Sequence, residues 1–585
     1  MENFKEIEAK ALTGNYSAMS ELANYYIQGN VVEKNIEEGI NWYEKAIKAG
    51  DDFAPQTVND IGYNLQVGQN GYEVNLSLAL RCYKIAADAG NVLGMSNYAY
   101  CNYCGTGTEK NYQAAYEYWQ KAADKGDAVC MNNVGFCYEY GYGVELDLTK
   151  AIDYYFMALD NKYQNAETTI KTFCENHKGE IFSERHLEYL VNNNLITEIC
   201  NLPANISKLP KLRNSEKLTT IILPDTIVEI PEGAFEECRM LRKVVLSKNI
   251  TKIPNRSFFH CVSLIDLYIP EGIQSIGECA FLGCSRLIEM SIPNSVKLIG
   301  TRAFQYCRAL SNVLLPTSIK VLPEDAFSDC KSLKEIAIPS SIVEIQSGVF
   351  SGCSSLTTAQ LSNCIAKVGD RVFDKCASLR DVTLSNAMDR IPFAMFRNCS
   401  SLKGLELPYS IREIGVQAFS GCVSLHTINI PNSVSKILRA AFDGCKSLTC
   451  LNIPDSVNTI GKGALERCIS IENLTIPFIG GSSDTNGNDD ILSYIFGYEM
   501  VTLGDLQIEE KNNKLIPVSL QHVTINGSNI PNDAFNGCSN IKSISLGSSV
   551  NKIENCAFYN CRSLGSITMH DSVRSVGTWA FADCN

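Results

Sequence analysis

The 585-residue sequence lacks the features that would point to a membrane or to a nucleic acid. It has no apolar run of about 18 residues, the length that a membrane-spanning helix needs. It has no excess of basic side chains, because 51 lysines and arginines stand against 64 aspartates and glutamates, a formal net charge of −13. An acidic chain repels phosphate backbones and anionic lipids. The sequence therefore predicts other proteins as partners, with no nucleic acid bound and no membrane insertion.

The N-terminal segment lacks the apolar core of a secretory signal. MENFKEIEAKAL carries charged residues where an export signal needs a continuous hydrophobic stretch. Twenty-five cysteines without such a signal indicate a reducing compartment and free thiols, and an odd number cannot all pair within one chain. We therefore expect a cytoplasmic protein, with the cell surface as the alternative.

The sequence also lacks the short motifs of common enzymes. It contains no G-x-S-x-G, no P-loop and no G-x-G-x-x-G at the start of a helix, and its six histidines are not at metal-ligand spacing from cysteines or carboxylates. Cys101 and Cys104 form a single C-x-x-C, which can be redox-active or half of a zinc site. No second such pair accompanies it, so we interpret both as positions of a repeated helix. We predict that the protein is not an enzyme and has no catalytic, cofactor-binding or metal-binding residues.

The sequence does contain two systems of internal repeats, and the first spans residues 1–165. Segments that end at Gly50, Gly90 and Gly126 place alanines and aromatics at i, i+3 and i+4, as an amphipathic helix does, and a following glycine is typical of a helix end. A fourth segment lacks the glycine. Each is preceded by a further helix and a glycine-rich turn, so GTGT (105–108) and GYGV (141–144) are interpreted as turns and not as phosphate-binding loops. About four such hairpins predict an α-solenoid.

The second system follows a segment without repeats, 166–194, whose helical periodicity predicts a cap and linker. From 195 to 585 the period is 23 residues, in the frame C-x-S-L-x-x-I-x-I-P-x-S-V-x-x-I-x-x-x-A-F-x-x-C with conservative replacements. The stretch L-x-x-I-x-I alternates as a strand does, and the proline ends it. The predicted fold class is a repeat protein, in which an N-terminal α-solenoid of helical hairpins precedes a leucine-rich β-solenoid with one strand per 23-residue coil.

Fourteen cysteines recur at this 23-residue step and form a cysteine ladder, Cys238, Cys261, Cys284, Cys307, Cys330, Cys353, Cys376, Cys399, Cys422, Cys445, Cys468, Cys538, Cys561 and Cys584. Neighbouring coils lie ~4.8 Å apart, so distance alone permits disulfides. Pairing would pull the stacked side chains out of register, and single sulfurs in a row cannot form a tetrahedral metal site. We therefore interpret the ladder as buried, reduced thiols that fill the core of each coil.

One irregular unit, 477–519, interrupts the β-repeat, and LQHVTINGSNIPNDAFNGC restores the frame after it. Within it, DTNGNDD (484–490) places oxygen ligands at alternate positions. An EF-hand loop needs glycine at its sixth position and glutamate at its twelfth, where this chain has Asp489 and Ile495. We interpret the stretch as a solvated turn and the irregular unit as a surface excursion. A functional loop with enzymatic or regulatory activity is the alternative.

The helical units resemble the Sel-one-like repeat, a relative of the tetratricopeptide repeat. The fourth unit matches at Ala128, Val134, Gly135, Tyr138, Gly141, Gly143, Val144, Asp147, Lys150, Ala151 and Tyr155. The third matches at Gly105, Gly107, Asn111, Ala114, Trp119, Lys121, Ala122, Ala123 and Gly126. The resemblance implies a scaffold that holds protein partners in a concave groove.

The Ile-Pro-x-Ser-Val and Ala-Phe-x-x-Cys frames look like the BspA-type leucine-rich repeat. Members of that family are surface or secreted proteins of bacteria and occur as large sets in anaerobic protists, where adhesion and protein binding are the usual assignments. The resemblance therefore also implies an adhesin.

Together these observations predict a non-enzymatic scaffold for protein–protein interactions, which binds partners on the concave faces of two solenoids. The alternative is a cell-surface adhesin of the BspA type that is exported without a recognisable signal. Outward strand residues from Arg242-Lys243 to Lys403-Gly404 are mixed in charge and poor in aromatics. In the coil between Cys422 and Cys445, we expect His426, Thr427 and Asn429 to face outward. The last coil, at Cys584, is expected either to be covered by a partner or to belong to a truncated chain.

Overall fold

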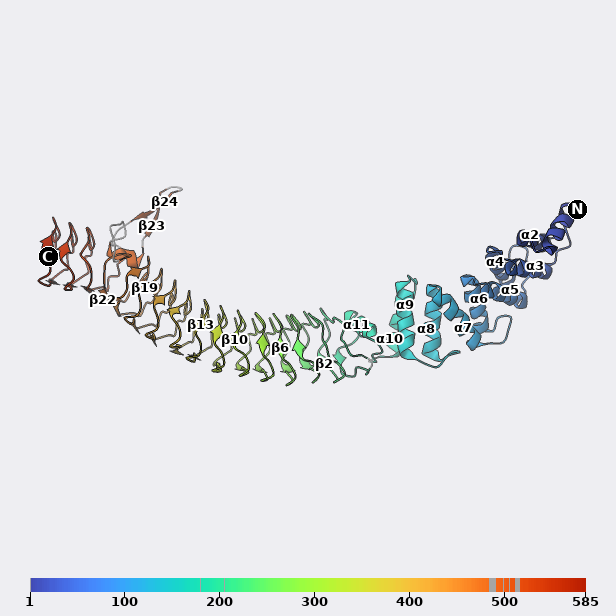
Figure 1. Ribbon diagram of the computed structural model, residues 1–585, viewed down its shortest axis with the longest axis horizontal. Coiled ribbons are helices and arrows are strands. Elements are labelled where there is room, and N and C mark those ends of the chain that lie inside the picture. The colour runs from blue at the N-terminus through green and yellow to red at the C-terminus, as the bar shows by residue number, and fades with distance from the viewer. Residues whose placement is uncertain are drawn as a thin grey trace. The chain divides into compact units, whose positions relative to one another are not determined.

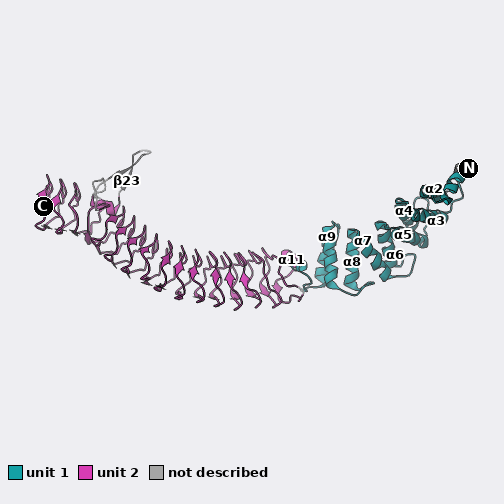
Figure 2. Ribbon diagram, in the orientation of Figure 1, with its two compact units in different colours: residues 1–187 teal, residues 188–585 magenta. Residues whose placement is uncertain are grey.

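The computed structural model describes residues 2–178, 180–204, 206–482, 491–497, 499–503, 506–510 and 516–584. The chain divides into two units, Met1–Leu187 and Glu188–Asn585 (Figure 2). The division falls within the segment predicted as cap and linker. The finer boundaries at residues 165 and 194 stay a prediction.

Unit 1 is built of helices, each of which packs against the next. They are α1 (Glu2–Leu12), α2 (Tyr16–Gln28), α3 (Ile36–Lys48), α4 (Ala54–Val67), α5 (Leu76–Asp88), α6 (Val92–Cys104), α7 (Tyr112–Asp124), α8 (Ala128–Tyr140), α9 (Leu148–Asp160) and α10 (Ala166–Asn176), with α11 (Glu184–Asn192) across the boundary (Figure 1). The predicted hairpins are α2–α3, α4–α5, α6–α7 and α8–α9. The α-solenoid is therefore confirmed.

Polar residues fix where the second helix of each hairpin begins. Asn35, Asn75, Asn111 and Asp147 are the N-cap residues of α3, α5, α7 and α9, and each side chain accepts a hydrogen bond from the backbone N–H three residues later. Such a bond satisfies a donor that the helix leaves free, and it contributes about 1 kcal/mol. An asparagine or aspartate N-cap thus marks every hairpin.

The glycine-rich turns are explained by close backbone contacts. A Cβ at Gly107 would overlap the carbonyl group of Leu76, and one at Gly143 would overlap that of Tyr112. These glycines let one hairpin approach the preceding one, which confirms GTGT and GYGV as turns of the repeat. In the fourth hairpin Lys162 adopts φ 64° where the other units have glycine.

Unit 2 is a β-solenoid in which parallel strands of successive coils pair. The L-x-x-I-x-I segments form a first ladder: β1 (Glu198–Ile199), β2 (Thr220–Ile222), β3 (Lys243–Val245), β5 (Asp266–Tyr268), β7 (Glu289–Ser291), β9 (Asn312–Leu314), β12 (Thr358–Gln360), β14 (Asp381–Thr383), β16 (Gly404–Glu406), β18 (Thr427–Asn429), β20 (Cys450–Asn452), β22 (Asn473–Ile476), β25 (His522–Ile525), β26 (Ser543–Leu546) and β28 (Ser566–Thr568). Partners such as Lys243 and Asp266 lie one coil apart. The predicted β-solenoid is confirmed.

The V-x-x-I segments add a second ladder that the sequence analysis did not identify. Its two-residue strands are β4 (Lys252–Ile253), β6 (Ser275–Ile276), β8 (Leu298–Ile299), β10 (Val321–Leu322), β11 (Glu344–Ile345), β13 (Lys367–Val368), β15 (Arg390–Ile391), β17 (Glu413–Ile414), β19 (Lys436–Ile437), β21 (Thr459–Ile460), β27 (Lys552–Ile553) and β29 (Ser575–Val576). Two residues are too few to show a strand periodicity in the sequence.

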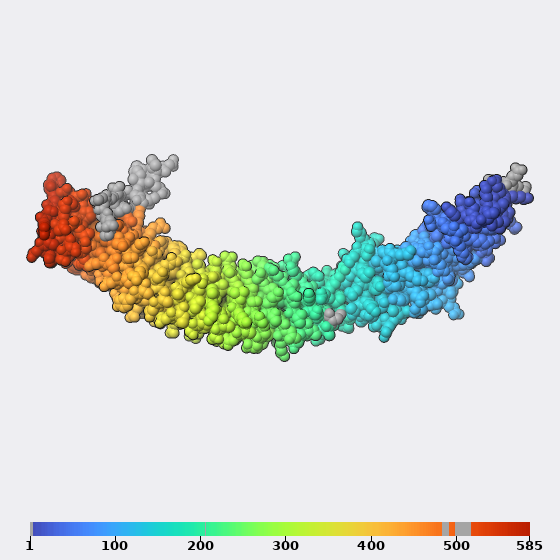
Figure 3. Space-filling model, in the orientation of Figure 1, coloured from blue at the N-terminus to red at the C-terminus, as the bar shows by residue number. Residues whose placement is uncertain are grey.

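The core of unit 2 consists of rows of the same side chain, one from each coil. The phenylalanines of the A-F pairs stack from Phe235 to Phe442 with ring centroids 5.2–6.0 Å apart. Leucines such as Leu333 are fully buried beside them. In the space-filling view neighbouring coils contact each other along the stack (Figure 3). Each coil is therefore stabilised mainly by its two neighbours.

The irregular unit completes a coil before the frame resumes. Strand β22 pairs directly with β25, so Asn473 lies opposite His522. The 3₁₀ helix η1 (Leu492–Phe496) contacts the coils on both sides: Leu465 N–H donates to Ile495, and Leu492 N–H donates to Ala534. Strands β23 (Glu499–Leu503) and β24 (Leu506–Glu510) form an antiparallel hairpin. The DTNGNDD stretch (484–490) lies outside the described residues.

Candidate functional site

The ladder cysteines were the first candidates for chemistry, and the structure places them in the core. Thirteen of the fourteen are buried and Cys584 is half-buried, and all twenty-five cysteines of the chain, which all lie in described segments, are free. Burial raises the pKa of the Cys422 thiol to about 12. A protonated thiol is a poor nucleophile and a poor metal ligand. The prediction of buried, unpaired thiols is confirmed.

The structure adds a role for these thiols that the sequence did not reveal. Thirteen of them donate an S–H hydrogen bond to a backbone carbonyl 26 residues earlier, over 3.0–3.3 Å. The carbonyl of Phe419, for example, accepts both the N–H of Cys422 in its own coil and the S–H of Cys445 in the next. A carbonyl oxygen has two lone pairs, so both are used. The cysteine thus joins consecutive coils.

The C-x-x-C motif is part of the helical repeat. Cys101 is buried in α6, where burial raises its pKa to about 11, and its carbonyl accepts the N–H of Gly105 at the helix end. Cys137 occupies the equivalent position in α8. Cys104 is half-buried. In the described part of the chain no three histidine, cysteine, aspartate or glutamate side chains gather as metal ligands would.

One cysteine–histidine contact was missed because its members are distant in sequence. The Cys174 sulfur lies 3.5 Å from Nε2 of His186, whose Nδ1 accepts the N–H of Phe182. Burial lowers the pKa of His186 to about 4 and raises that of Cys174 to about 11. Both groups are therefore neutral and buried near neutral pH, which suits packing and not nucleophilic catalysis.

Unit 1 has an exposed apolar surface at equivalent positions of consecutive hairpins. We call it the helical stripe, and its members lie one, five or twelve residues before the glycine that ends α4, α6 or α8. They are Tyr63, Val67, Leu93, Tyr100, Val129 and Tyr140, all of them exposed. These intervals place the side chains on one face of each helix. Because the hairpins repeat, α4, α6 and α8 present equivalent faces in succession.

Aromatic side chains gather beside the end of this stripe. Tyr103, Tyr112, Phe136, Tyr140 and Tyr142 have neighbouring ring centroids 4.6–5.9 Å apart. They come from α6, α7, α8 and the following turn, and only Tyr140 is strongly exposed. Such rings give a large contact area that loses little conformational entropy on binding.

The two units differ in charge. Residues 1–187 contain 26 aspartates and glutamates against 15 lysines and arginines, and residues 188–585 contain 38 against 36. Unit 1 therefore carries a formal net charge of −11 and unit 2 one of −2. The acidic balance noted in the sequence belongs almost entirely to unit 1.

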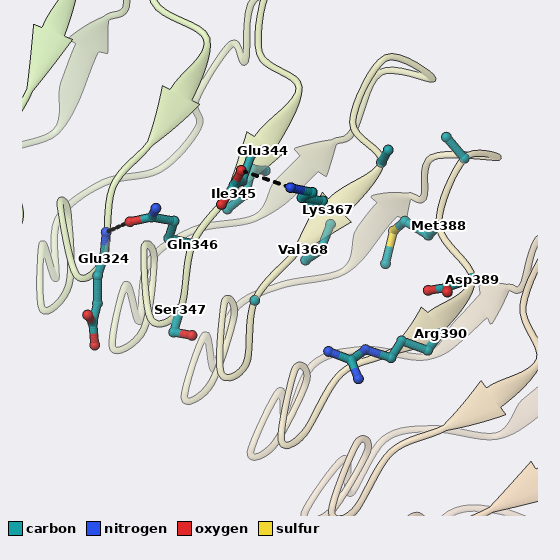
Figure 4. A pocket seen from close by; sticks show the side chains of 13 residues that line it. Glu324, Glu344, Ile345, Gln346, Ser347, Lys367, Val368, Met388, Asp389 and Arg390 are labelled. Carbon is teal, nitrogen blue, oxygen red and sulfur yellow. Dashed lines mark hydrogen bonds and ion pairs between the residues drawn. The ribbon is translucent and has the colours of Figure 1, made fainter.

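A groove of about 700 Å³ runs over the second ladder at strands β11, β13 and β15 (Figure 4). Glu344 and Lys367 face each other across two coils with 3.9 Å between Oε2 and Nζ, and the side chain of Gln346 accepts the N–H of Glu324 at 3.0 Å. Both interactions join residues of neighbouring coils to each other. Exposed ion pairs of this kind contribute little to stability or binding.

The first ladder presents two outward rows. His426, Thr427 and Asn429 are exposed, as predicted. The predicted outward surface comprised the first two open positions of each strand and, in one coil, Asn429. The rest of a second outward row, which includes Tyr268 and Glu406 beside Asn429, was missed. This row lies two residues after the first on the same face.

In the described residues no helix is both long and apolar enough to cross a membrane. No curated protein matches the chain. Three solved structures are similar to parts of it. A leucine-rich repeat protein from Bacteroides ovatus is 24% identical over 65% of this chain and 91% of its own, with a TM-score of 0.44.

A leucine-rich cell surface protein from Faecalibacterium prausnitzii is 26% identical over 43% of this chain and 86% of its own, with a TM-score of 0.30. A Sel1 repeat protein from Oxalobacter formigenes is 26% identical over 31% of this chain and 72% of its own, with a TM-score of 0.24.

Two family models match the chain, one in each unit. The Sel1 repeat matches residues 17–51, 58–91, 92–127 and 128–163. The BspA type leucine-rich repeat region matches in overlapping stretches, 211–333, 297–409, 322–446, 389–519 and 507–585. Repeats of both types are typical of binding scaffolds and cell-surface proteins, and they are generally non-catalytic. The chain therefore belongs to the BspA-type leucine-rich repeat family, and its N-terminal unit is a Sel1-repeat solenoid.

Proposed function

We propose that the protein is a non-enzymatic scaffold that binds other proteins on the faces of both solenoids, with the helical stripe as its main protein-binding surface. The alignment of exposed apolar side chains over three hairpins carries this proposal. Folded proteins rarely expose contiguous apolar surface, and such patches usually mark interaction sites. Tyrosine, which supplies three of the six side chains, is enriched at interfaces.

Polar groups within the stripe would orient a bound partner. Asn97 of α6 and Asn133 of α8 lie at equivalent positions between the apolar side chains, eight residues before the ending glycine. Asn97 donates to the side chain of Asn59 over 2.9 Å. Amides both donate and accept hydrogen bonds, so they can orient a bound polypeptide.

The surrounding charge favours a basic partner. The excess of carboxylates in unit 1 attracts positively charged proteins and raises their association rate at low salt. We further propose a cytoplasmic location, which the twenty-five unpaired cysteines support because free thiols persist in reducing compartments.

Photo-cross-linking from the full-length protein tests the proposed surface. A photoreactive amino acid replaces Tyr100 in the stripe, and in a matched control it replaces Glu117, which is exposed on α7. Both variants are irradiated in the cells that produce the protein. We expect protein adducts from position 100 and few from position 117. Equal labelling from both positions, or none from position 100, would contradict the proposal.

A further inference from the structure

A second groove, of about 990 Å³, lies on the first ladder over strands β14, β16, β18 and β20. Its floor is the outward face of four consecutive coils, and the backbone groups of these strands point along the sheet toward their neighbours. A ligand in this groove therefore meets side chains and not the edge of a sheet. The groove belongs to unit 2, apart from the helical stripe.

A glycine opens the centre of the groove. In the first outward row, Asp381 of β14 is followed by Gly404 of β16 and Thr427 of β18, so a side chain is missing between two that are present. Nothing in the backbone requires glycine there: its φ is not left-handed, and a Cβ would meet its nearest neighbour at 3.5 Å, an ordinary contact. Glycine weakens a strand and often marks a place where a ligand approaches closely.

Four polar side chains surround this opening. Asp381, Glu406, Asn429 and Asn452 are exposed and line the groove. Among the described residues none of these four side chains has a hydrogen-bond or ion-pair partner. Two carboxylates accept hydrogen bonds only, and two amides both donate and accept. The set can therefore bind several hydroxyl groups at once.

An aromatic ring stands at the rim. Tyr409 follows Pro408 at the end of β16, and its side chain is 82% exposed, more than any other tyrosine among the exposed large hydrophobic side chains. Exposing a tyrosine ring to this extent leaves most of its apolar face in water. A flat apolar ligand surface would cover it.

We propose that this groove binds an uncharged oligosaccharide. A sugar ring has one apolar C–H face, which packs on Tyr409, and hydroxyl groups at its edge, which donate to Asp381 and Glu406 and exchange hydrogen bonds with Asn429 and Asn452. The hollow at Gly404 admits the ring between the neighbouring side chains. This goes beyond the proposed protein scaffold and concerns a different unit.

The groove fits other ligand classes less well. Asp381 and Glu406 line it together with a single cation, Arg380, and this net negative charge disfavours nucleic acids and acidic glycans. An extended peptide is recognised at a sheet edge by main-chain hydrogen bonds, and the strand backbone under this groove faces neighbouring coils instead. Side-chain amides and carboxylates around an aromatic ring match the alternation of hydroxyl groups and apolar face in a sugar.

Calorimetric titration of the full-length protein tests this site. The probes are four neutral tetrasaccharides: cellotetraose, maltotetraose, mannotetraose and N-acetylchitotetraose. We expect at least one to bind, and Gly404→Gln, which fills the hollow, to weaken its affinity about tenfold or more, as should Tyr409→Ala. Tyr268→Ala removes a 63% exposed tyrosine of the same ladder outside the groove and should leave the affinity unchanged.

Each outcome decides the proposal. Both groove positions are at the surface, so the variants should unfold at the temperature of the original protein, which a melting curve checks. Failure of all four sugars to bind at millimolar concentration would overturn the proposal, as would equal affinity of the groove variants and the original. Binding of a lysine-rich peptide that only the groove variants lose would assign the groove to a polypeptide instead. The helical-stripe cross-links do not depend on any of these results.

Discussion

Both units consist of stacked repeats, but different interactions hold the repeats together in each. In unit 1 each hairpin is fixed locally by an N-cap side chain such as Asn111 and by glycines that allow close approach. In unit 2 each coil is fixed by its neighbours, through paired strands, stacked phenylalanines and the S–H bond of a cysteine. The comparison shows that a position repeated in every unit is structural. The exposed positions are the ones available for function, whether they recur, as in the helical stripe, or vary, as along the first ladder.

The largest loss of stability should come from a substitution in the core of unit 2. Replacing Leu333, which is fully buried, by alanine should lower the free energy of unfolding of unit 2 by about 2–5 kcal/mol, because a cavity opens in a coil that supports two others. Urea unfolding followed by peptide-resolved hydrogen exchange checks this. Exchange in α2 to α9 should not change, and a loss of protection there would show that the units are not independently stabilised.

One pH effect on stability should arise in unit 1, from a buried histidine. His186 is fully buried, and its folded-state pKa of about 4 lies below the unfolded value of 6.5, so the unfolded chain binds the extra proton first. Stability should therefore be complete above pH 6.5 and fall as the pH drops toward 4, by roughly 2–3 kcal/mol. Denaturant titrations at pH 7.5 and 4.5 measure it. His177 lies nearby and is kept in both proteins, so His186→Phe should remove most of the dependence.

Replacing a ladder cysteine should destabilise the protein more than replacing an exposed cysteine. Cys422→Ala removes a buried side chain and one of the two hydrogen bonds to the Phe396 carbonyl, and should cost about 1–2 kcal/mol. The matched control is Cys450→Ala on the outward face of β20, where the thiol is exposed. Thermal unfolding of both variants compares them, and an equal shift would argue against the structural role of the ladder.

The smallest predicted effect is a stabilisation of unit 2 by a single substitution to glycine. Lys375 adopts φ 61° at a position where Gly352 and Gly421 stand in other coils. Because a left-handed backbone is strained for any residue with a Cβ, Lys375→Gly should raise the free energy of unfolding by about 0.5–1 kcal/mol. Chemical denaturation would detect the increase. A decrease would mean that the lysine side chain compensates for its backbone strain.

Periodicity made most of this fold predictable. The 23-residue frame identified Leu333, the phenylalanine row and the cysteine ladder as core, and the glycine spacing identified the hairpins. The second ladder was missed because its strands have two residues each. The Cys174–His186 contact was missed because it depends on how α10 packs against α11, outside the repeats. The groove around Gly404 was missed because a glycine at one outward position looks unremarkable in a repeat that tolerates any residue there.

The most direct test of the central claim, that repeated positions are structural and the outer faces carry function, is thiol labelling of the native protein at pH 8 with mass-spectrometric readout. Burial raises the pKa of ladder thiols, that of Cys468 to about 12, so the thirteen buried members should stay unlabelled until denaturant is added. Cys364 and Cys450 are exposed and should react at once. Rapid native labelling of the ladder, or disulfides between its members, would contradict the account.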